Sequence, residues 1–285
     1  MAMIKSNGVR FGCDDAGAGP VVVLVHAGCA DRRMWEHQVT ALSGRHRVIR
    51  YDWRGHGESA DAVGDFAHHE DLLALLDSLE VQQAALVGCS DGGKIVLDAA
   101  LTAPERVSSL TLVAAGLSGH TWPSSMLDLY RERVHSVIGL DRLRRYRAGA
   151  AGAVETADLD AHAAAETEFL VAGPGRSRAD LAPEVWRLAL DMDRLVNERM
   201  WTVPQAPGRP PTSPAKERLA EVGVPALVVI GSADVPEIQA ASDLLAEGIK
   251  GARKVVLPDT GHLPPLERPE EFNAALIDFL DGSVT

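Results

Sequence analysis

The spacing of apolar residues changes along this chain and separates predicted strands from predicted helices. The run 21–25 is wholly apolar, which is typical of a strand buried on both faces of a sheet. Further strands are predicted at 47–51, 84–87 and 110–113, and leucines recur at helical spacing within 66–79. This alternation predicts an α/β fold with a mostly parallel central sheet and helices on both of its faces.

Residues 118–221 interrupt the alternation, because they contain no convincing strand pattern. They are rich in Ala, Arg and Glu, and helices are predicted at 124–138, 143–165 and 183–200. The stretch 203–214 is dense in proline, which favours a stiff, extended connector over a helix.

The last part of the chain returns to the α/β rhythm. Strands are predicted at 226–230 and 254–257, and helices at 236–247 and 269–280. The simplest organisation is one core domain, residues 1–117 and 222–285, interrupted by a helical insertion, residues 118–221.

A candidate nucleophile lies between the strand 84–87 and the helical stretch 94–102. The intervening residues read Gly-Cys-Ser-Asp-Gly, with Ser90 at the centre. A sharp strand-to-helix turn of this form needs small residues on both sides of the serine, and it exposes the hydroxyl group. The motif alone is weak evidence, because an ordinary turn can carry it, so a base and an acid must be found elsewhere.

Suitable partners follow two later strands. Asp234 comes after the strand 226–230, and His262 comes after the strand 254–257. Because functional groups gather at the carboxyl ends of parallel strands, these side chains are expected near Ser90. Two other acids, Asp259 and Glu237, compete with Asp234, but the first is close to His262 along the loop and the second lies within a helix. Taken alone, His262 would be read as an ordinary loop histidine.

At this point the chain resembles the α/β-hydrolase superfamily over nearly all its length. The matching pieces are His26-Ala27-Gly28, the loop from Asp52 to Ser59, the Gly-Cys-Ser-Asp-Gly turn, Asp234, Gly261-His262, and the stretches 264–267 and 269–272. One departure is Ala27, where many members have a second glycine. Together these motifs are specific for the superfamily and say little about the substrate.

The resemblance implies a role for each matching position. Ser90 would attack a carbonyl carbon, His262 would act as the base, and Asp234 would orient and stabilise the imidazole ring. The backbone N–H of Asp91 would stabilise the developing oxyanion, and alignment to the family loop places the N–H of Gly28 as its second donor.

The side chain of Asp91 has two possible roles, since it either complements the positive end of the following helix or pairs with a cationic group of the substrate. His26 and His56 are interpreted as structural loop residues. His68 and His69 lie at a polar helix start and are expected to be solvated.

The insertion resembles a cap over the active site, which would exclude water and shape specificity. Large apolar side chains of this segment are candidates to line an acyl pocket, although packing between the cap and the core is an alternative for each of them. These candidates are Trp122, Met126, Tyr130, Phe169, Trp186 and Trp201, of which Trp122, Met126, Trp186 and Trp201 are taken forward as substrate-binding residues.

Composition narrows the class of protein. The chain has 285 residues, 46% of them hydrophobic, and a net charge of −12. The negative charge argues against nucleic-acid binding, which needs concentrated Lys and Arg. No signal peptide or membrane-spanning run is recognised, and three cysteines suggest neither a disulfide framework nor a zinc site. A soluble, cytoplasmic protein is expected, with a small-molecule substrate and no metal or cofactor; the oligomeric state is open.

The predicted activity is hydrolysis of carboxylic esters through an acyl-enzyme. The same residues would also suit a lactone, an amide or a carbon–carbon bond next to a carbonyl. A third class is a ligand receptor or cyclase on this fold, without hydrolysis. The sequence does not identify the natural substrate.

Overall fold

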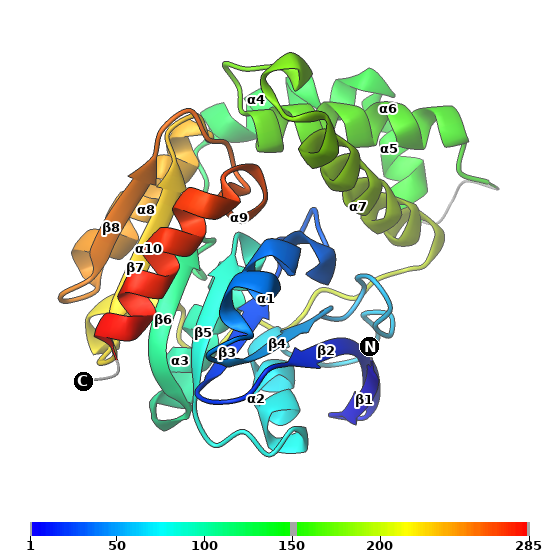
Figure 1. The fold of residues 1–285 in the computed structure, drawn as a ribbon. Helices are drawn as coiled ribbons and strands as arrows, with labels where there is room; N and C mark the ends of the chain where they lie inside the picture. Colours follow the sequence, from blue (N-terminus) through cyan, green and yellow to red (C-terminus); the bar gives the residue numbers. More distant parts are fainter. Residues whose placement is uncertain (1, 149–152, 284–285) are drawn as a thin grey trace.

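A computed structural model describes residues 2–148 and 153–283. Its centre is one eight-stranded sheet with the order β1-β2-β4-β3-β5-β6-β7-β8 (Figure 1). The strands are β1 (Ala2–Ser6), β2 (Val9–Ala16), β3 (Val21–Val25), β4 (Arg47–Tyr51), β5 (Ala84–Cys89), β6 (Val107–Val113), β7 (Ala226–Gly231) and β8 (Arg253–Leu257). All neighbouring pairs from β4 to β8 are parallel, whereas β2 is antiparallel to both β1 and β4. The predicted mostly parallel sheet is confirmed.

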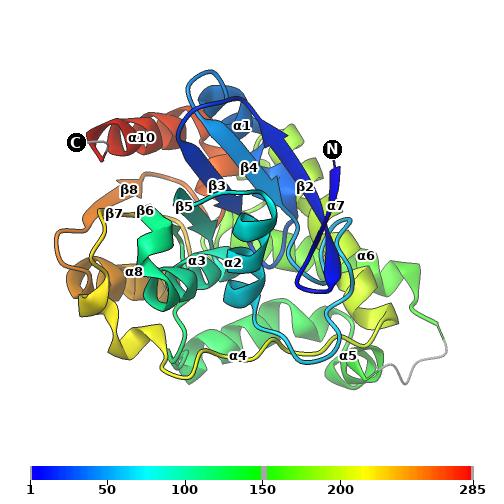
Figure 2. The ribbon, with the colours of Figure 1, turned by 90° about the horizontal axis from the view of Figure 1, so that it is seen from below.

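Helices cover both faces of the sheet, as predicted. They are α1 (Glu36–Leu42), α2 (His68–Ser78), α3 (Asp91–Thr102), α8 (Pro236–Gly248), α9 (Pro264–Glu267) and α10 (Pro269–Gly282). Figure 2 shows α1 and α10 on one face and α2, α3 and α8 on the other. Each face forms its own apolar cluster, one around Leu72 and Ile95 and the other around Trp35 and Phe272. Because water is excluded from both faces, β3 and β5 have the continuous apolar character that the sequence shows.

Among the described residues, four further α-helices lie between β6 and β7, and Figure 1 shows them grouped on one side of the sheet domain. They are α4 (Ser124–Arg133), α5 (Leu140–Arg147), α6 (Thr156–Thr167) and α7 (Pro183–Thr202). The single helix predicted at 143–165 is wrong, because α5 ends at Arg147 and α6 begins only at Thr156. Residues 149–152 of this prediction lie outside the described part of the chain.

None of the helices in residues 2–148 and 153–283 is both long and apolar enough to cross a membrane.

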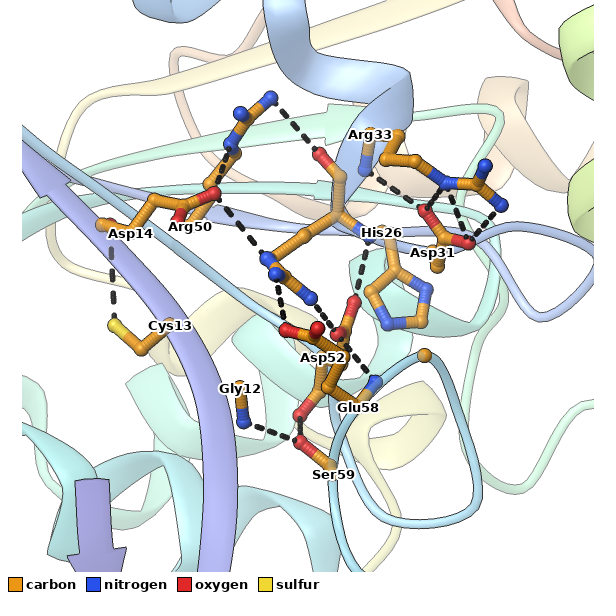
Figure 3. A network of polar contacts seen from close by, with 12 residues as sticks. Gly12, Cys13, Asp14, His26, Asp31, Arg33, Arg50, Asp52, Glu58 and Ser59 are labelled. Carbon is orange, nitrogen blue, oxygen red and sulfur yellow. Dashed lines mark hydrogen bonds and ion pairs between the residues drawn. The ribbon is translucent and has the colours of Figure 1, made fainter. Parts of the chain in front are cut away.

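A buried charge network fixes the loop that follows β4 (Figure 3). The Arg32 guanidinium pairs with Asp52, with Asp14 at 3.2 Å and with Glu58 at 2.6 Å. The Asp52 carboxylate is fully buried and also accepts hydrogen bonds from the backbone N–H groups of Arg32 (2.8 Å) and Glu58 (3.0 Å). A Cβ at Gly57, where φ is +46°, would lie 2.1 Å from Asp52 Oδ2, so only glycine fits there. The loop is therefore held rigidly beside the strand ends.

Candidate active site

The turn between β5 and α3 holds the half-buried Ser90 in a strained backbone conformation. Ser90 has φ 54° and ψ −119°, a region that non-glycine residues rarely adopt. A Cβ at Gly88 would approach the Gly92 carbonyl oxygen to 2.3 Å, and one at Gly92 would approach the Val25 carbonyl oxygen to 2.2 Å. The two glycines therefore allow the close packing of strand, turn and helix that the motif predicts.

Three polar side chains, far apart in sequence, meet at this turn. His262 Nε2 lies 2.9 Å from Ser90 Oγ, and His262 Nδ1 lies 2.8 Å from Asp234 Oδ2. His262 follows β8 and Asp234 follows β7, and both are buried, with exposures of 3% and 2%. If Nδ1 donates to the carboxylate, Nε2 is left as an acceptor for the serine hydroxyl proton.

The environment of His262 favours proton uptake. Burial opposes the charged imidazolium, but the Asp234 carboxylate and its hydrogen bond raise the pKa of His262 above its ordinary value. The raised pKa gives the ring enough basicity to accept a proton during the attack by the serine hydroxyl. Asp234 is itself held in place, because its Oδ1 accepts a hydrogen bond of 2.7 Å from the N–H of Val235.

The two competing acids lie elsewhere. Glu237 is in α8, where its Oε1 accepts a hydrogen bond of 2.8 Å from Ser125 Oγ. Asp259 is exposed, and its backbone N–H donates to Ser232 Oγ. Asp234 is thus the carboxylate that meets His262.

Both residues expected to donate to an oxyanion adjoin the serine turn. Asp91 is the first residue of α3, so its backbone N–H belongs to the unpaired donors of a helix start. Gly28 lies alongside, since a Cβ at that position would be 2.6 Å from Asp91 Oδ2. His56 Nε2 lies 2.9 Å from the Gly28 carbonyl oxygen and fixes this loop.

The Asp91 side chain has a partner within the protein. Its Oδ1 lies 2.6 Å from Lys94 Nζ, one turn along α3. Burial alone would raise the pKa of Asp91, but Lys94 lowers it below its ordinary value. The carboxylate lies in the first turn of α3, at the positive end of the helix, and its ion pair with Lys94 is a further role that was not predicted.

A cavity with two lobes surrounds Ser90. The first, called here the His262 lobe, has a volume of about 640 Å³ and is lined by His262, Trp122, Met126 and Lys94. The second, called the Cys29 lobe, has a volume of about 520 Å³ and is lined by residues that include Gly28, Cys29, Glu166 and Asp193. Both lobes share Ser90, Asp91, Trp53, His68, Leu170, Pro207 and Gly208 as lining residues. Ser90 therefore lies where the two lobes meet.

The structure brings two of the four predicted substrate-binding residues to Ser90 and places the other two elsewhere. Trp122 and Met126 line the His262 lobe. Trp186 is buried in the apolar cluster that includes Trp35, with the Arg178 guanidinium over its ring. Trp201 stacks on Tyr146, with ring centroids 5.0 Å apart. The prediction that Trp186 and Trp201 bind substrate is wrong. Both side chains lie on α7 and pack in apolar clusters away from the cavity.

The histidines near the loops are more buried than the sequence suggests. His68 and His69 were expected to be solvated, which is wrong: His69 is buried and His68 lines both lobes. Burial lowers the pKa of His68 to about 4. His26 and His56 pack with Trp53 in the loop layer, and burial lowers the pKa of each to about 4. Their structural interpretation agrees with this packing.

Some lining residues were not anticipated. The proline-dense segment, read as a connector, contributes Pro207 and Gly208 to both lobes. Its backbone is tied to the core by hydrogen bonds from Ala206 N–H to the Ala62 carbonyl and from Arg209 N–H to the Phe66 carbonyl. Glu166 and Asp193 were missed as well: Asp193 lies within the predicted helix 183–200, whereas Glu166 is one residue beyond the predicted helix 143–165.

Comparison with known proteins agrees with this fold. The model of a protein family described as the alpha/beta hydrolase fold matches residues 20–269. The chain belongs to the alpha/beta hydrolase fold family.

Individual relatives differ in the substrates that their names indicate. A protein of Azorhizobium caulinodans that bears the provisional name carbamate hydrolase RutD is 31% identical over 275 residues, covering 92% of each chain. Epoxide hydrolase A of Mycobacterium tuberculosis is 27% identical, covering 98% of this chain and 97% of the relative. The enol-lactonase structure from Burkholderia xenovorans LB400 superposes with a TM-score of 0.72 at 25% identity, covering 98% of this chain and 100% of that one. The family relation is thus firm, and the substrate must be inferred from the chemistry of the site.

Proposed function

We propose that this protein hydrolyses carboxylic esters through a covalent acyl-enzyme, with Ser90 as the nucleophile. The observation that supports this most strongly is the position of His262, 2.9 Å from the Ser90 hydroxyl and 2.8 Å from the Asp234 carboxylate. A serine hydroxyl is weakly nucleophilic at neutral pH and needs such a base within hydrogen-bond distance.

In the acylation half-reaction, Ser90 Oγ bonds to the carbonyl carbon while its proton passes to His262 Nε2. The carbonyl oxygen becomes an oxyanion, which the N–H groups of Gly28 and Asp91 stabilise; loss of one such donor typically costs about 3 kcal/mol. The carbon–oxygen bond to the alcohol then breaks, and His262 returns the proton to the departing oxygen. Asp234 stabilises the transient imidazolium.

In the deacylation half-reaction, water takes the place of the alcohol. His262 removes a proton from this water as it attacks the acyl carbon, and a second tetrahedral oxyanion forms. When that intermediate collapses, the bond to Ser90 Oγ breaks, His262 reprotonates the serine, and a carboxylic acid is released. The protein ends the cycle unchanged.

The identity of the nucleophile argues for acyl substrates. If Ser90 opened an epoxide, the product would be an ether with the enzyme, which acid–base groups of this kind do not hydrolyse. Attack on an acyl carbon instead gives an ester, which His262 and water can cleave. The chemistry of a serine nucleophile therefore favours carbonyl substrates over epoxides.

In this proposal, the core and the cap have different functions. Residues 1–117 and 222–285 form the core that carries Ser90, Asp234 and His262, and residues 118–221 form a cap. Trp122, Met126 and Leu170 of this segment line the cavity that holds Ser90. A cap in this position would exclude water from the reacting groups and select the substrate.

Lactone hydrolysis is a second candidate, favoured by the likeness to an enol-lactonase structure across the whole chain. A lactone is a cyclic ester, so the same steps apply, but the leaving hydroxyl remains attached to the acyl group.

The test is turnover of p-nitrophenyl acetate, p-nitrophenyl butyrate and γ-butyrolactone by the wild type and by Ser90→Ala. We expect ester turnover in the wild type and a loss in kcat on the order of a millionfold in the variant. Turnover that survives in purified Ser90→Ala would contradict the assignment. Inert esters together with rapid lactone opening would replace the ester proposal with the lactone one.

A further inference from the structure

The residue that follows the nucleophile is an acid, which is an unfavourable neighbour for an oxyanion. In the proposed function, on which this inference rests, the backbone N–H groups of Asp91 and Gly28 bind the oxyanion that forms in each half-reaction. The Asp91 carboxylate belongs to the same residue as one donor and packs against the other, because a Cβ at Gly28 would lie 2.6 Å from Asp91 Oδ2. Its negative charge would oppose the charge that develops on the substrate.

Lys94 places a positive charge on this carboxylate. It lies one helical turn after Asp91 in α3, and its Nζ is 2.6 Å from Asp91 Oδ1. The Lys94 and Asp91 side chains are 39% and 46% exposed, and both line the His262 lobe together with Ser90. A substrate that fills this lobe would displace water from the pair and so reduce the screening of the two charges.

The histidines around Asp91 do not supply a second positive charge. His56 and His68 line the cavity near the Asp91 carboxylate. Burial lowers the pKa of each to about 4, so both rings are neutral at neutral pH.

The other charged groups that line the His262 lobe have partners of their own. Asp98 lies one turn beyond Lys94 in α3, and its Oδ1 accepts a hydrogen bond of 2.6 Å from Ser118 Oγ. Arg209 is the other cation among the described residues of this lobe, and it pairs with Asp65 and with an acid of α2. The counter-charge of Asp91 is therefore Lys94.

The charge on Asp91 also acts on the catalytic base. Burial opposes the charged form of His262, but Asp234 and, more weakly, Asp91 raise the pKa of His262. A change in the net charge of the Asp91–Lys94 pair should therefore be detectable at His262 as well as at the oxyanion.

We propose that Lys94 is a positioning residue for the proposed acyl transfer, which holds and neutralises the Asp91 carboxylate beside the two oxyanion donors. Lys94 acts through Asp91 and exchanges no proton with the substrate. Without it, an uncompensated carboxylate would adjoin an oxyanion that is absent from the bound substrate. The loss should therefore appear in kcat more than in KM.

The first test is the turnover of p-nitrophenyl butyrate by Lys94→Met, which keeps the aliphatic stem and removes the charge. On the alkaline plateau of the pH profile we expect kcat to fall by about tenfold or more, since Coulomb energies over a few ångströms are of this size. Lys94→Gln provides a second neutral variant, and Lys94→Arg, which keeps the charge, should retain most of the wild-type kcat. The control Lys250→Met removes an exposed lysine between α8 and β8, outside both lobes, and should leave kcat unchanged.

A double-mutant cycle separates this electrostatic role from a merely structural one. When Asp91 is already asparagine, there is no carboxylate to neutralise, so the further change Lys94→Met should lower kcat by less than about threefold. An equal loss in the two backgrounds overturns the proposal. It also fails if neither neutral variant loses more than about threefold in the wild-type background.

The pH profile gives a second readout of the same pair. Lys94→Met leaves the negative charge of Asp91 uncompensated, which favours the imidazolium form of His262 and raises its pKa. The acidic limb of kcat/KM should therefore move to higher pH in Lys94→Met. In the Asp91→Asn background, the same replacement should leave the limb nearly in place.

A measurement without turnover distinguishes this inference from the proposed function. If no ester is cleaved, the proposed function fails, and the pair is then tested by NMR titration of the His262 imidazole. We expect a higher pKa for His262 in Lys94→Met than in the wild type, and a much smaller difference when Asp91 is asparagine. An equal pKa of His262 in the wild type and Lys94→Met would refute the role of Lys94, whatever the enzyme hydrolyses.

Discussion

Replacement of Asp234 by asparagine gives the most informative single perturbation of the proposed mechanism. The side chain keeps its size, and the buried site is expected to stay folded. The hydrogen bond at issue is 2.8 Å long and joins two groups that are no more than 3% exposed. Water does not screen it, so the full interaction with the imidazolium is lost.

The magnitude follows from the two functions of this carboxylate. It selects the tautomer in which Nε2 can accept the Ser90 proton, and it stabilises the positive charge that His262 carries in both transition states. In a serine protease of another fold, the same Asp-to-Asn change lowers kcat by about 10⁴-fold, and we expect a loss of about 10³–10⁴-fold here. The Asp234 carboxylate also raises the pKa of His262, so the variant should have a lower pKa at this residue.

The assay is a pH profile of kcat/KM for p-nitrophenyl butyrate. Because neutral His262 is the active base, the rate rises with pH through the pKa of His262. The midpoint should lie above pH 6.5 in the wild type, since the pKa of His262 is raised from that ordinary value, and it should move to lower pH in Asp234→Asn. A loss of less than about tenfold, or an acidic limb that does not move, would refute the role given to Asp234.

Two further predictions concern stability. Arg32→Met removes the cation beside the buried Asp52, and loss of a partner from a buried ion pair costs about 3–5 kcal/mol. Urea unfolding should show a decrease of this size in the unfolding free energy. The control variant Arg45→Met, at an exposed ion pair, should change the unfolding free energy by less than about 1 kcal/mol. Among the histidines whose pKa burial lowers to about 4 are the three nearest the active-site loops, His26, His56 and His68. The unfolded chain therefore binds more protons than the folded one between about pH 6.5 and 4, and stability should fall on acidification through this window by up to about 4 kcal/mol per pH unit. Equal urea midpoints at pH 7 and pH 5 would contradict this account of the histidines.

The parts of the fold that sequence reasoning identified are those in which a local pattern carries the information. The apolar run 21–25 and the strand 84–87 are buried on both faces, and their composition alone reveals this. The first two strands, at 2–6 and 9–16, were not recognised, because both mix polar with apolar residues; β1 is the edge strand and β2 lies next to it. Edge strands have a solvent-facing side, so their pattern is weaker.

The candidate site was predictable for a different reason. Ser90, Asp234 and His262 each follow a strand, and parallel strands bring their carboxyl ends to one edge of the sheet. No comparable rule predicts which side chains of residues 118–221 line the cavity. An indole such as Trp186 or Trp201 is apolar whichever way its helix turns, and only the packing of α7 decides between the cavity and the core.

The sequence also did not allow us to predict which charged residues pair with one another. Lys94 lies three residues after Asp91, and this helical spacing is the one local clue to their pair. Glu166 and Asp193 lie in two successive α-helices, and their proximity depends on how α6 packs on α7. Long-range pairing of this kind follows from tertiary structure, which local patterns do not encode.

The central claim is that Ser90, activated by His262, becomes covalently acylated. Intact-protein and peptide mass spectrometry after exposure to a fluorophosphonate probe tests it directly. We predict one adduct per chain, located on the peptide that contains Ser90, in the wild type, and none in Ser90→Ala or His262→Ala. An unmodified wild type, or an adduct on another residue such as Cys29, would contradict the account.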